Sequence, residues 1–307
     1  MSTAKQSCTS SNLPRRRGKA VATLELERVI LDIVAERAPL TVRGICYALF
    51  TQGLIASMSV GNTARISRIA TAMREAGTLD WAQIVDGSRA VDRVDLWNNP
   101  DEIIRSAICG YRRDHWRDQP VLVEVWSEKA TVHGILQPVL DELGVAFRVM
   151  KGFGSYTALR QAAEDSLGLP ADRDGLALYL GDWDPSGLYM SEADIPARLA
   201  RYGSRWAFRR IALTRDDLDH LPYFDVATKA GDARHKWYLR STTADPCRCW
   251  ELDALNPNSL RKRVRDSITA YMDADAWRHS LMVEQAERES LQHFHRAWTA
   301  QVGGRHA

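Results

Sequence analysis

The sequence predicts an α/β fold in two parts, a small helical domain followed by a larger domain built on a parallel sheet. Before about residue 100, apolar residues recur at helical spacing. From Pro120 onward, short apolar runs of β character alternate with helical segments, in the order β-α-β-α-β. This alternation is typical of a parallel sheet with helices on its faces. With 307 residues, the chain is long enough for each part to bury its own core.

The composition excludes several classes of protein. Apolar residues make up 45% of the chain and charged residues 26%, as in an ordinary soluble globular protein. The net charge of +2 excludes a uniformly basic surface, so any nucleic-acid interface must come from local clusters of Arg and Lys. No apolar run reaches the roughly 18 residues that a membrane span needs, and the N-terminus lacks a signal-peptide core. We therefore expect a cytoplasmic protein with reduced cysteines and no membrane partner.

Residues 1–21 predict a disordered basic arm. They are polar, contain five Lys and Arg residues, and include no acidic residue. Such an arm either contacts DNA phosphates or keeps the chain soluble, and the sequence does not decide between the two.

Residues 22–99 predict a winged-helix domain. Apolar residues from Leu24 to Val34 recur at helical spacing, and Thr41 is a suitable N-cap for a second helix. A third helix is expected over 62–76, and short β-like pieces surround an Asp-Gly turn within 78–91. Three helices and a hairpin would place one helix in a DNA groove. The third helix carries the best candidates for DNA contact, although such charges also fit a solvated face: Arg65, Arg68 and Arg74.

Residues 100–118 predict a linking helix, 119–272 the sheet domain with its C-terminal elaboration, and 273–307 a C-terminal helix and tail. The expected strands of the sheet domain lie near 120–126, 145–150, 175–180 and 209–214.

Acidic residues follow two of these strands at the point where each ends. Glu128 follows the first strand, and Asp182 and Asp184 follow the third. The carboxyl ends of parallel strands meet at one edge of a sheet, and residues two apart in extended chain point the same way. Carboxylate oxygens suit Mg²⁺, or Mn²⁺ in its place, beside a phosphodiester. The sequence therefore predicts a metal site here, although Asp-x-Asp-Pro-x-Gly also fits a polar turn or a helix cap. Glu124, within the strand, is expected to be structural.

Three motifs carry a family resemblance. W-S-E-K-A, K-G-F-G-S-Y-T-A-L-R and L-Y-L-G-D-W-D-P-S-G resemble, in order and spacing, the Toprim domain of the topoisomerase VI A subunit and its meiotic double-strand-break relatives. The resemblance covers roughly 23–272, and it is also seen with bacterial and phage Toprim proteins of the same two-part layout. W-E-L-D-A-L resembles a further family element, which implies that Glu251 supports the site. The resemblance implies a Toprim domain over 119–272, binding of double-stranded DNA near the nucleoid, a homodimer, and a separate ATPase B-type subunit.

The same family has a catalytic tyrosine on its winged-helix domain. The segment T-V-R-G-I-C-Y is similar to the family motif and places Arg43 and Tyr47 on one helix face. The resemblance implies that Tyr47 attacks the phosphodiester and becomes linked to the 5′ end of the DNA. Arg43 would hold the phosphate and favour the phenolate. The structural alternative is that Tyr47 only packs its helix against a neighbour.

Three functions remain open at this point. The first is transesterification through Tyr47. The second is hydrolysis by a Toprim nuclease, similar to the OLD family or to plasmid-defence nucleases, in which Tyr47 is dispensable. The third is DNA binding without catalysis. Lys129 and Lys151 are candidates for phosphate contact near the metal, or else members of a solvated rim.

Overall fold

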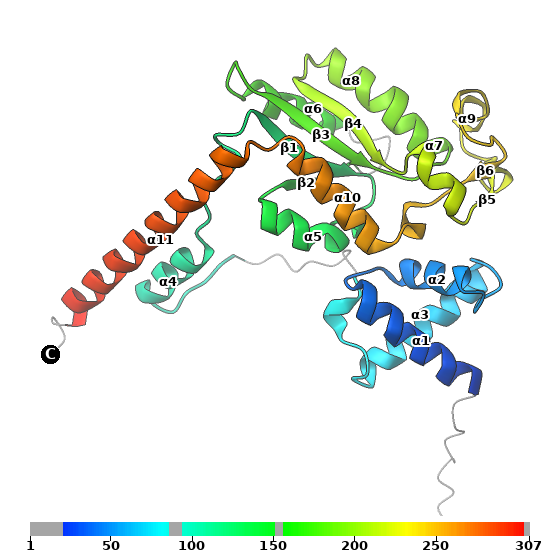
Figure 1. Ribbon diagram of the computed structural model, residues 1–307, viewed down its shortest axis with the longest axis horizontal. Helices are drawn as coiled ribbons and strands as arrows, with labels where there is room; N and C mark the ends of the chain where they lie inside the picture. Colours follow the sequence, from blue (N-terminus) through cyan, green and yellow to red (C-terminus); the bar gives the residue numbers. More distant parts are fainter. Residues whose placement is uncertain (1–20, 86–93, 151–155, 304–307) are drawn as a thin grey trace, which may run out of the picture.

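The computed structural model of the protein describes residues 21–85, 94–150 and 156–303 (Figure 1). A helical unit lies beside a larger unit built on a parallel sheet, and two further helices form an arm that extends away from the sheet. The mixed α/β class expected from the sequence is confirmed.

The helical unit consists of three helices packed around one apolar core. The helices are α1 (Val21–Arg37), α2 (Val42–Thr51) and α3 (Val60–Glu75). The inward-facing residues of all three helices are fully buried, among them Ile30, Ile45 and Ile66. Thr41 caps α2 as predicted, because its Oγ1 accepts a hydrogen bond of 2.9 Å from the amide of Gly44.

The hairpin expected within 78–91 is not found in the part of this segment that the structure describes. Residues 81–83 form a short 3₁₀ helix, η1 (Trp81–Gln83), because Asp80 accepts from the amide of Ala82 and caps it. Ile84 then makes a single parallel bridge with Leu40. The rest of the expected hairpin, residues 86–91, lies outside the described residues.

The sheet has four parallel strands in the order β2-β1-β3-β4. The strands are β1 (Val121–Ser127), β2 (Ala146–Val149), β3 (Asp174–Leu180) and β4 (Trp206–Ala212). The fourth strand begins three residues earlier than expected, because Trp206 pairs with Gly175 and packs its ring against that glycine.

Helices cover both faces of the sheet (Figure 1). On one face, α5 (Thr131–Leu143) and α10 (Pro257–Thr269) pack against alternate strand residues such as Val125 and Leu178. On the other, α6 (Tyr156–Leu167) and α8 (Ile195–Arg201) pack against Trp126, Ala177 and Tyr179. The period-two alternation of a strand thus divides the apolar residues between two cores.

The strand order reverses between β1 and β3, since β2 lies on one side of β1 and β3 lies on the other. In open α/β sheets, the crevice beyond the carboxyl ends of the strands at such a reversal is the usual ligand site. Ser127 and Leu180 are partners at the ends of the two strands. Glu128 and the Gly181–Asp182 segment therefore leave the sheet side by side.

The chain after β4 brings a distant segment to this edge. Trp183, just beyond β3, and Trp250 exchange two backbone hydrogen bonds of 2.9 Å. The short elements between β3 and β4 are α7 (Pro185–Tyr189) and the π-helical turn η2 (Met190–Asp194). Those after β4 are η3 (Arg215–His220), β5 (Phe224–Asp225), η4 (Val226–Lys229), α9 (His235–Ser241), β6 (Arg248–Cys249) and η5 (Leu252–Ala254). β5 and β6 pair antiparallel.

The arm consists of α4 (Pro100–Gly110) and α11 (Ala274–Gly303). The linking helix expected over 100–118 therefore ends at Gly110. The 30 residues of α11 span about 45 Å. Contacts at both ends of α4 join it to α11. Tyr111 Oη donates to Glu287 at 2.6 Å, and His295 Nε2 lies 2.7 Å from Asp101. None of the helices in the described part is long and apolar enough to cross a membrane.

Arg261 of α10 fixes the helical unit against the sheet unit. Its guanidinium donates to the carbonyl oxygens of Arg37 and Pro39, at the end of α1, and to that of Ile135 in α5. Asn258, on the same helix, donates from Nδ2 to the Glu36 carbonyl at 3.0 Å. These bonds set where α2 lies relative to the sheet edge.

Candidate active site

The two aspartates after β3 are buried and held by specific partners. Asp182 is 7% exposed, and its Oδ1 accepts from the Leu252 amide at 2.7 Å and from Lys129 Nζ at 2.8 Å. Asp184 is 4% exposed, and its Oδ2 lies 3.2 Å from Lys229 Nζ. Each carboxylate therefore faces a lysine from another part of the chain.

The Asp-x-Asp-Pro-x-Gly motif has a local structural reason as well. Asp184 is the N-cap of α7, and its Oδ1 accepts from the Gly187 amide at 2.8 Å, while Pro185 occupies the first turn. A Cβ at Gly187 would lie 2.6 Å from the carbonyl oxygen of Asp182, so this position requires glycine. The helix-cap alternative thus accounts for one oxygen of Asp184, and the other oxygen remains available to the site.

Arg210, which sequence reasoning did not identify, holds this loop by hydrogen bonds to backbone carbonyl oxygens. Its guanidinium donates to the carbonyl oxygens of Gly181 and Gly187 at 2.9 Å and to that of Leu213 at 3.1 Å. Burial lowers its pKa. The only signal in the sequence is an arginine pair within an otherwise apolar strand.

Electrostatic repulsion couples the three predicted carboxylates. Burial, followed by the negative charges of Asp182 and Asp184, raises the pKa of Glu128 to about 7. Burial also raises the pKa of Asp182, although Lys129 opposes the change. Within the described residues, Glu128 makes no hydrogen bond and no ion pair. The folded chain thus confines negative charge that its own residues compensate only in part.

This donor set fits a divalent cation in its chemistry, because three hard, mutually repelling carboxylates lie at one edge of the sheet. Among the residues that the structure describes, however, no group of three His, Cys, Asp or Glu side chains is arranged to hold a metal ion. Lys129 and Lys229 instead supply the positive charge at the two aspartates. Binding of Mg²⁺ would therefore require these side chains to reorient.

Glu128→Gln is expected to stabilise the protein in the absence of divalent cations. The pKa of Glu128 is higher in the folded state, so the folded state binds more protons and its stability falls as pH rises from about 4.5 to about 7. At pH 8.5 we expect the variant to gain about 2 kcal/mol, less than the roughly 3 kcal/mol of the full shift. At pH 4, below both pKa values, the gain should nearly vanish. Urea unfolding at both pH values measures it.

The matched control is Glu75→Gln, at an exposed position in α3 outside the acidic cluster, which should change stability little at either pH. A Glu128→Gln variant no more stable than wild type at pH 8.5 would contradict the proposed charge repulsion.

Tyr47 and Arg43 meet Glu251, which lies 204 residues after Tyr47 in the chain. Tyr47 is 5% exposed, and its Oη donates to Glu251 Oε2 at 3.0 Å. The Arg43 guanidinium donates two hydrogen bonds to the same carboxylate. The Arg43 Cζ also lies 5.8 Å from the centroid of the Tyr47 ring. The structure thus brings together Tyr47 and Arg43, as expected, and adds Glu251, which the resemblance had assigned to support of the metal site.

Arg43 acts on the phenol in the expected direction, but other groups outweigh it. Burial, and next the negative charge of Glu251, raises the pKa of Tyr47 above its ordinary value. Arg43 acts in the opposite sense but is outweighed, since its charge is paired with Glu251. Tyr47 is therefore a protonated phenol whose proton points at a carboxylate, with Arg43 orienting that carboxylate.

Three consecutive residues connect the tyrosine to the acidic cluster. Glu251 accepts from Tyr47, the Leu252 amide donates to Asp182, and Asp253 accepts from Thr41 Oγ1 at 3.0 Å. The second carboxyl oxygen of Asp253 lies 2.9 Å from Lys129 Nζ. Burial acts to lower the pKa of Lys129, but Asp182 and Asp253 outweigh it and raise the pKa. Lys129 therefore serves as a charged link between the end of β3 and segment 251–253.

Thr41→Val is expected to lower the free energy of unfolding by about 1–2 kcal/mol. The substitution removes both the cap of α2 and the hydrogen bond to Asp253, while it keeps the size of the side chain. Denaturant unfolding measures the loss, and the cleavage assay below should show lower activity because α2 carries Tyr47. Thr63→Val, in the first turn of α3, removes only bonds within its own helix and should cost less. Equal costs for the two variants would contradict this link.

The remaining predicted residues lie outside this cluster. Arg65 and Arg68 are exposed on α3, whereas Ile66 and Ile69 of the same helix are buried. Lys151 lies outside the described residues. Glu124 accepts from Trp126 Nε1 at 2.7 Å and pairs with Arg148 at 2.9 Å, which gives it a structural role on the α6 face.

Sequence reasoning missed Thr41 as a link between the units, and missed Asp253 and Lys229 entirely. Asp253 lies two residues after Glu251 within W-E-L-D-A-L, so its motif was visible although its role was not. Lys229 carries no local signal, because only the tertiary fold places it at Asp184.

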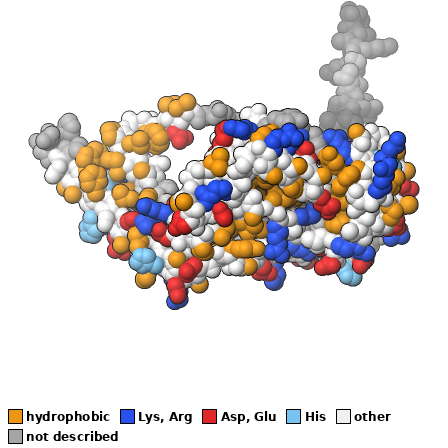
Figure 2. Space-filling model, turned by 90° about the horizontal axis from the view of Figure 1, so that it is seen from above, with side chains coloured by type: hydrophobic (Ala, Val, Ile, Leu, Met, Phe, Trp, Pro, Cys, Tyr) orange, Lys and Arg blue, Asp and Glu red, His pale blue; other side chains and the backbone are white. Residues whose placement is uncertain are grey.

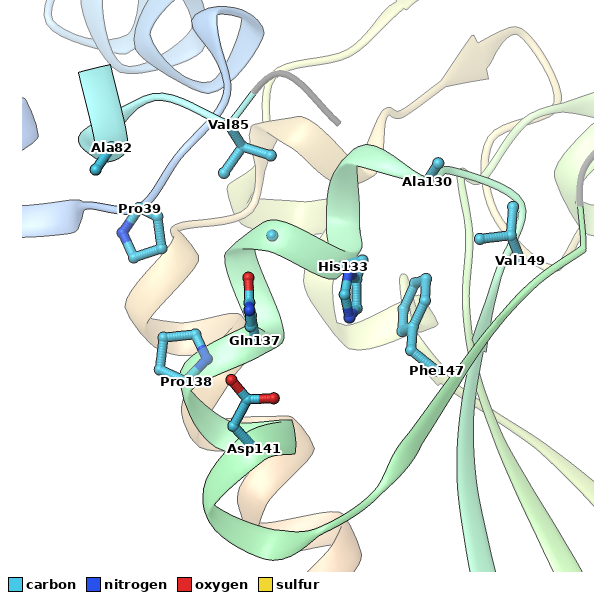
Figure 3. A pocket seen from close by; sticks show the side chains of 11 residues that line it. Pro39, Ala82, Val85, Ala130, His133, Gln137, Pro138, Asp141, Phe147 and Val149 are labelled. Carbon is cyan, nitrogen blue, oxygen red and sulfur yellow. The ribbon is translucent and has the colours of Figure 1, made fainter. Parts of the chain in front are cut away.

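Two hollows lie near the junction of the helical and sheet units. A cleft of about 530 Å³ opens beside Tyr47, and Arg43, Lys229 and Glu251 also line it. A separate pocket of about 680 Å³ lies between η1 and α5 and contains none of the predicted site residues (Figure 3). Its polar side chains come from one face of α5: His133, Gln137 and Asp141.

Comparison with protein-family models, with curated proteins and with solved structures finds no match to the chain. The fold and the site define the class: an α/β protein with an acidic cluster where the strand order of a four-stranded parallel sheet reverses, next to a buried tyrosine from a helical unit.

Proposed function

We propose that the protein is a Mg²⁺-dependent DNA-cleaving enzyme similar to the topoisomerase VI A subunit, with a winged-helix domain and a Toprim domain. One observation carries the proposal. Tyr47 donates to Glu251, and the next residue along the chain, Leu252, holds Asp182 of the acidic cluster. A nucleophile and a set of carboxylates from distant parts of the chain thus converge on one short segment, 251–253.

In this proposal Glu128, Asp182 and Asp184 would hold a Mg²⁺ ion, which would supply positive charge beside the scissile phosphate. Tyr47 Oη forms a bond to phosphorus while its proton passes to Glu251. The bond from phosphorus to the 3′ oxygen breaks, and that oxygen leaves as a hydroxyl after it takes up a proton. The DNA 5′ end remains linked to Tyr47. Arg43 positions Glu251 for the proton transfer.

The proposed partner is double-stranded DNA, bound in part by α3. Arg65 and Arg68 are exposed on that helix. Figure 2 shows Lys and Arg side chains in separate groups, interleaved with acidic and hydrophobic ones, on the face that it draws. This pattern supports local phosphate contacts rather than one continuous basic surface.

A homodimer is the second proposed partnership, and a separate ATPase B-type subunit would be needed for strand passage. Hydrophobic side chains gather at the end of the molecule where the arm lies (Figure 2). The exposed hydrophobic residues of the two arm helices include Ile103 of α4 and Met282 and Phe294 of α11, which are 43%, 65% and 63% exposed. No residue of α4 is buried in the single chain. A second copy packed on the arm would cover these side chains.

A second candidate function is hydrolysis by a Toprim-like nuclease. The protonated state of Tyr47 favours it, because a phenol held by Glu251 is a poor nucleophile until its proton leaves. In that case a water molecule attacks the phosphodiester, and Tyr47 helps only to hold α2 against 251–253.

The test is cleavage of supercoiled plasmid with Mg²⁺ or Mn²⁺, with EDTA as the control, stopped with detergent. Samples are run with and without protease. We expect metal-dependent cleavage whose DNA ends enter the gel only after proteolysis. Free ends without protease would establish the nuclease instead. An absence of cleavage with either metal would overturn both functions.

A further inference from the structure

The cleft beside Tyr47 has a second wall whose residues play no part in the proposed chemistry. One wall comes from α2 and the segment that follows it, and includes Phe50 and Met58. The other wall is formed by β5 and its neighbours, and includes Pro222, Tyr223 and Phe224. The volume of the cleft, about 530 Å³, lies within the range of sites that bind small organic groups.

Tyr223 is an exposed aromatic residue that is nevertheless held in position. It is 52% exposed, yet the Arg248 guanidinium lies 4.0 Å from its ring centroid. The Trp250 ring lies 6.1 Å from it, centroid to centroid. An aromatic ring fixed in this way offers a flat surface to a ligand at a small cost in conformational entropy.

The polar groups of the cleft are two cations, several hydroxyls and the carboxylate of Glu251, which pairs with Arg43. Arg43 and Lys229 line it next to the acidic cluster, and Lys229 Nζ also lies 5.8 Å from the Phe224 ring centroid. Ser57 and Thr228 add hydroxyl groups, each of which both donates and accepts hydrogen bonds. Aromatic surfaces beside cations are the usual combination that binds unpaired nucleotides: bases stack on the rings, and phosphates contact the positive charges.

We infer that this cleft binds an unstacked DNA base next to the scissile phosphate, with the base on Tyr223 and its phosphate between Arg43 and Lys229. The inference rests on the proposed function and extends it, since it names the part of the substrate that this wall recognises. A base that leaves the helix costs least where it is mismatched or unpaired. The enzyme should therefore prefer DNA that is locally open at the cleavage site.

The test compares the binding of two single strands by the full-length protein in EDTA, so that no cleavage occurs. One strand is a fluorescein-labelled twelve-residue oligothymidine, and the other is a backbone of equal length and charge that lacks bases. Fluorescence anisotropy at fixed salt gives both affinities. We expect wild type to bind the strand with bases about tenfold more tightly, and Tyr223→Ala to lose most of that difference.

Two further variants complete the test. Tyr223→Phe keeps the ring and should bind as wild type does. Trp97→Ala removes an exposed aromatic residue outside the cleft and should also leave the difference intact. Equal affinity of wild type for the two strands, or a difference that survives Tyr223→Ala, would overturn the inference. Plasmid cleavage without base-dependent binding would overturn only this inference. Base-dependent binding without cleavage would overturn only the proposed function.

Discussion

Tyr47→Phe is expected to lower DNA cleavage by about a thousandfold or more and to eliminate the protease-sensitive adducts. The variant keeps the buried ring and loses only the hydroxyl that donates to Glu251. Its free energy of unfolding should therefore fall by only about 1 kcal/mol. The loss of cleavage then reports the nucleophile rather than the stability of α2. The measurement is the plasmid assay, with covalent transfer of a 3′-labelled linear DNA strand to the protein as a second readout.

Tyr111→Phe is the matched control for this prediction. Tyr111 also donates its hydroxyl to a glutamate, Glu287, at 2.6 Å, but it lies on the arm. We expect this variant to cleave as wild type does and to form the same adducts. Cleavage that persists in Tyr47→Phe and yields free ends would show that the enzyme hydrolyses DNA and that Tyr47 is structural.

Asp182→Asn is expected to lower cleavage with either metal by more than about a hundredfold. About a hundredfold is the largest loss expected for a group that only supports a metal ligand. Asparagine keeps the size of the side chain and an oxygen to accept from the Leu252 amide. It removes the charge that pairs with Lys129 and that would bind Mg²⁺. Metal binding can be followed without activity, because a ligand that binds the folded state raises the melting temperature. Mg²⁺ should stabilise wild type and leave Asp182→Asn unchanged.

The control is Asp165→Asn. This aspartate lies on α6, away from the acidic cluster, and pairs with Arg148 at 2.9 Å. This variant should retain both cleavage and stabilisation by Mg²⁺. An Asp182→Asn variant that still cleaves DNA would show that the acidic cluster is not the metal site.

Much of the fold and half of the site followed from local sequence pattern. The alternation of β and helical segments predicted the parallel sheet, and the sheet is present with helices on both faces. Glu128 and Asp182 were expected at one edge because each follows a strand, and the pairing of Ser127 with Leu180 puts them there. The β-like piece expected before the Asp-Gly pair was wrong, because residues 81–83 form a 3₁₀ turn.

The sequence by itself determined which residues lie on α2 and at the ends of β1 and β3, because helical and strand periodicity are local properties. Only the tertiary structure decided that Tyr47 would meet Glu251, and that lysines from two other segments would face the aspartates. These contacts join segments up to 204 residues apart, and no local pattern encodes such pairs. The protonation states depend on them in turn. Burial and Glu251 together outweigh Arg43 at the phenol, and that balance exists only when all three are packed in one place.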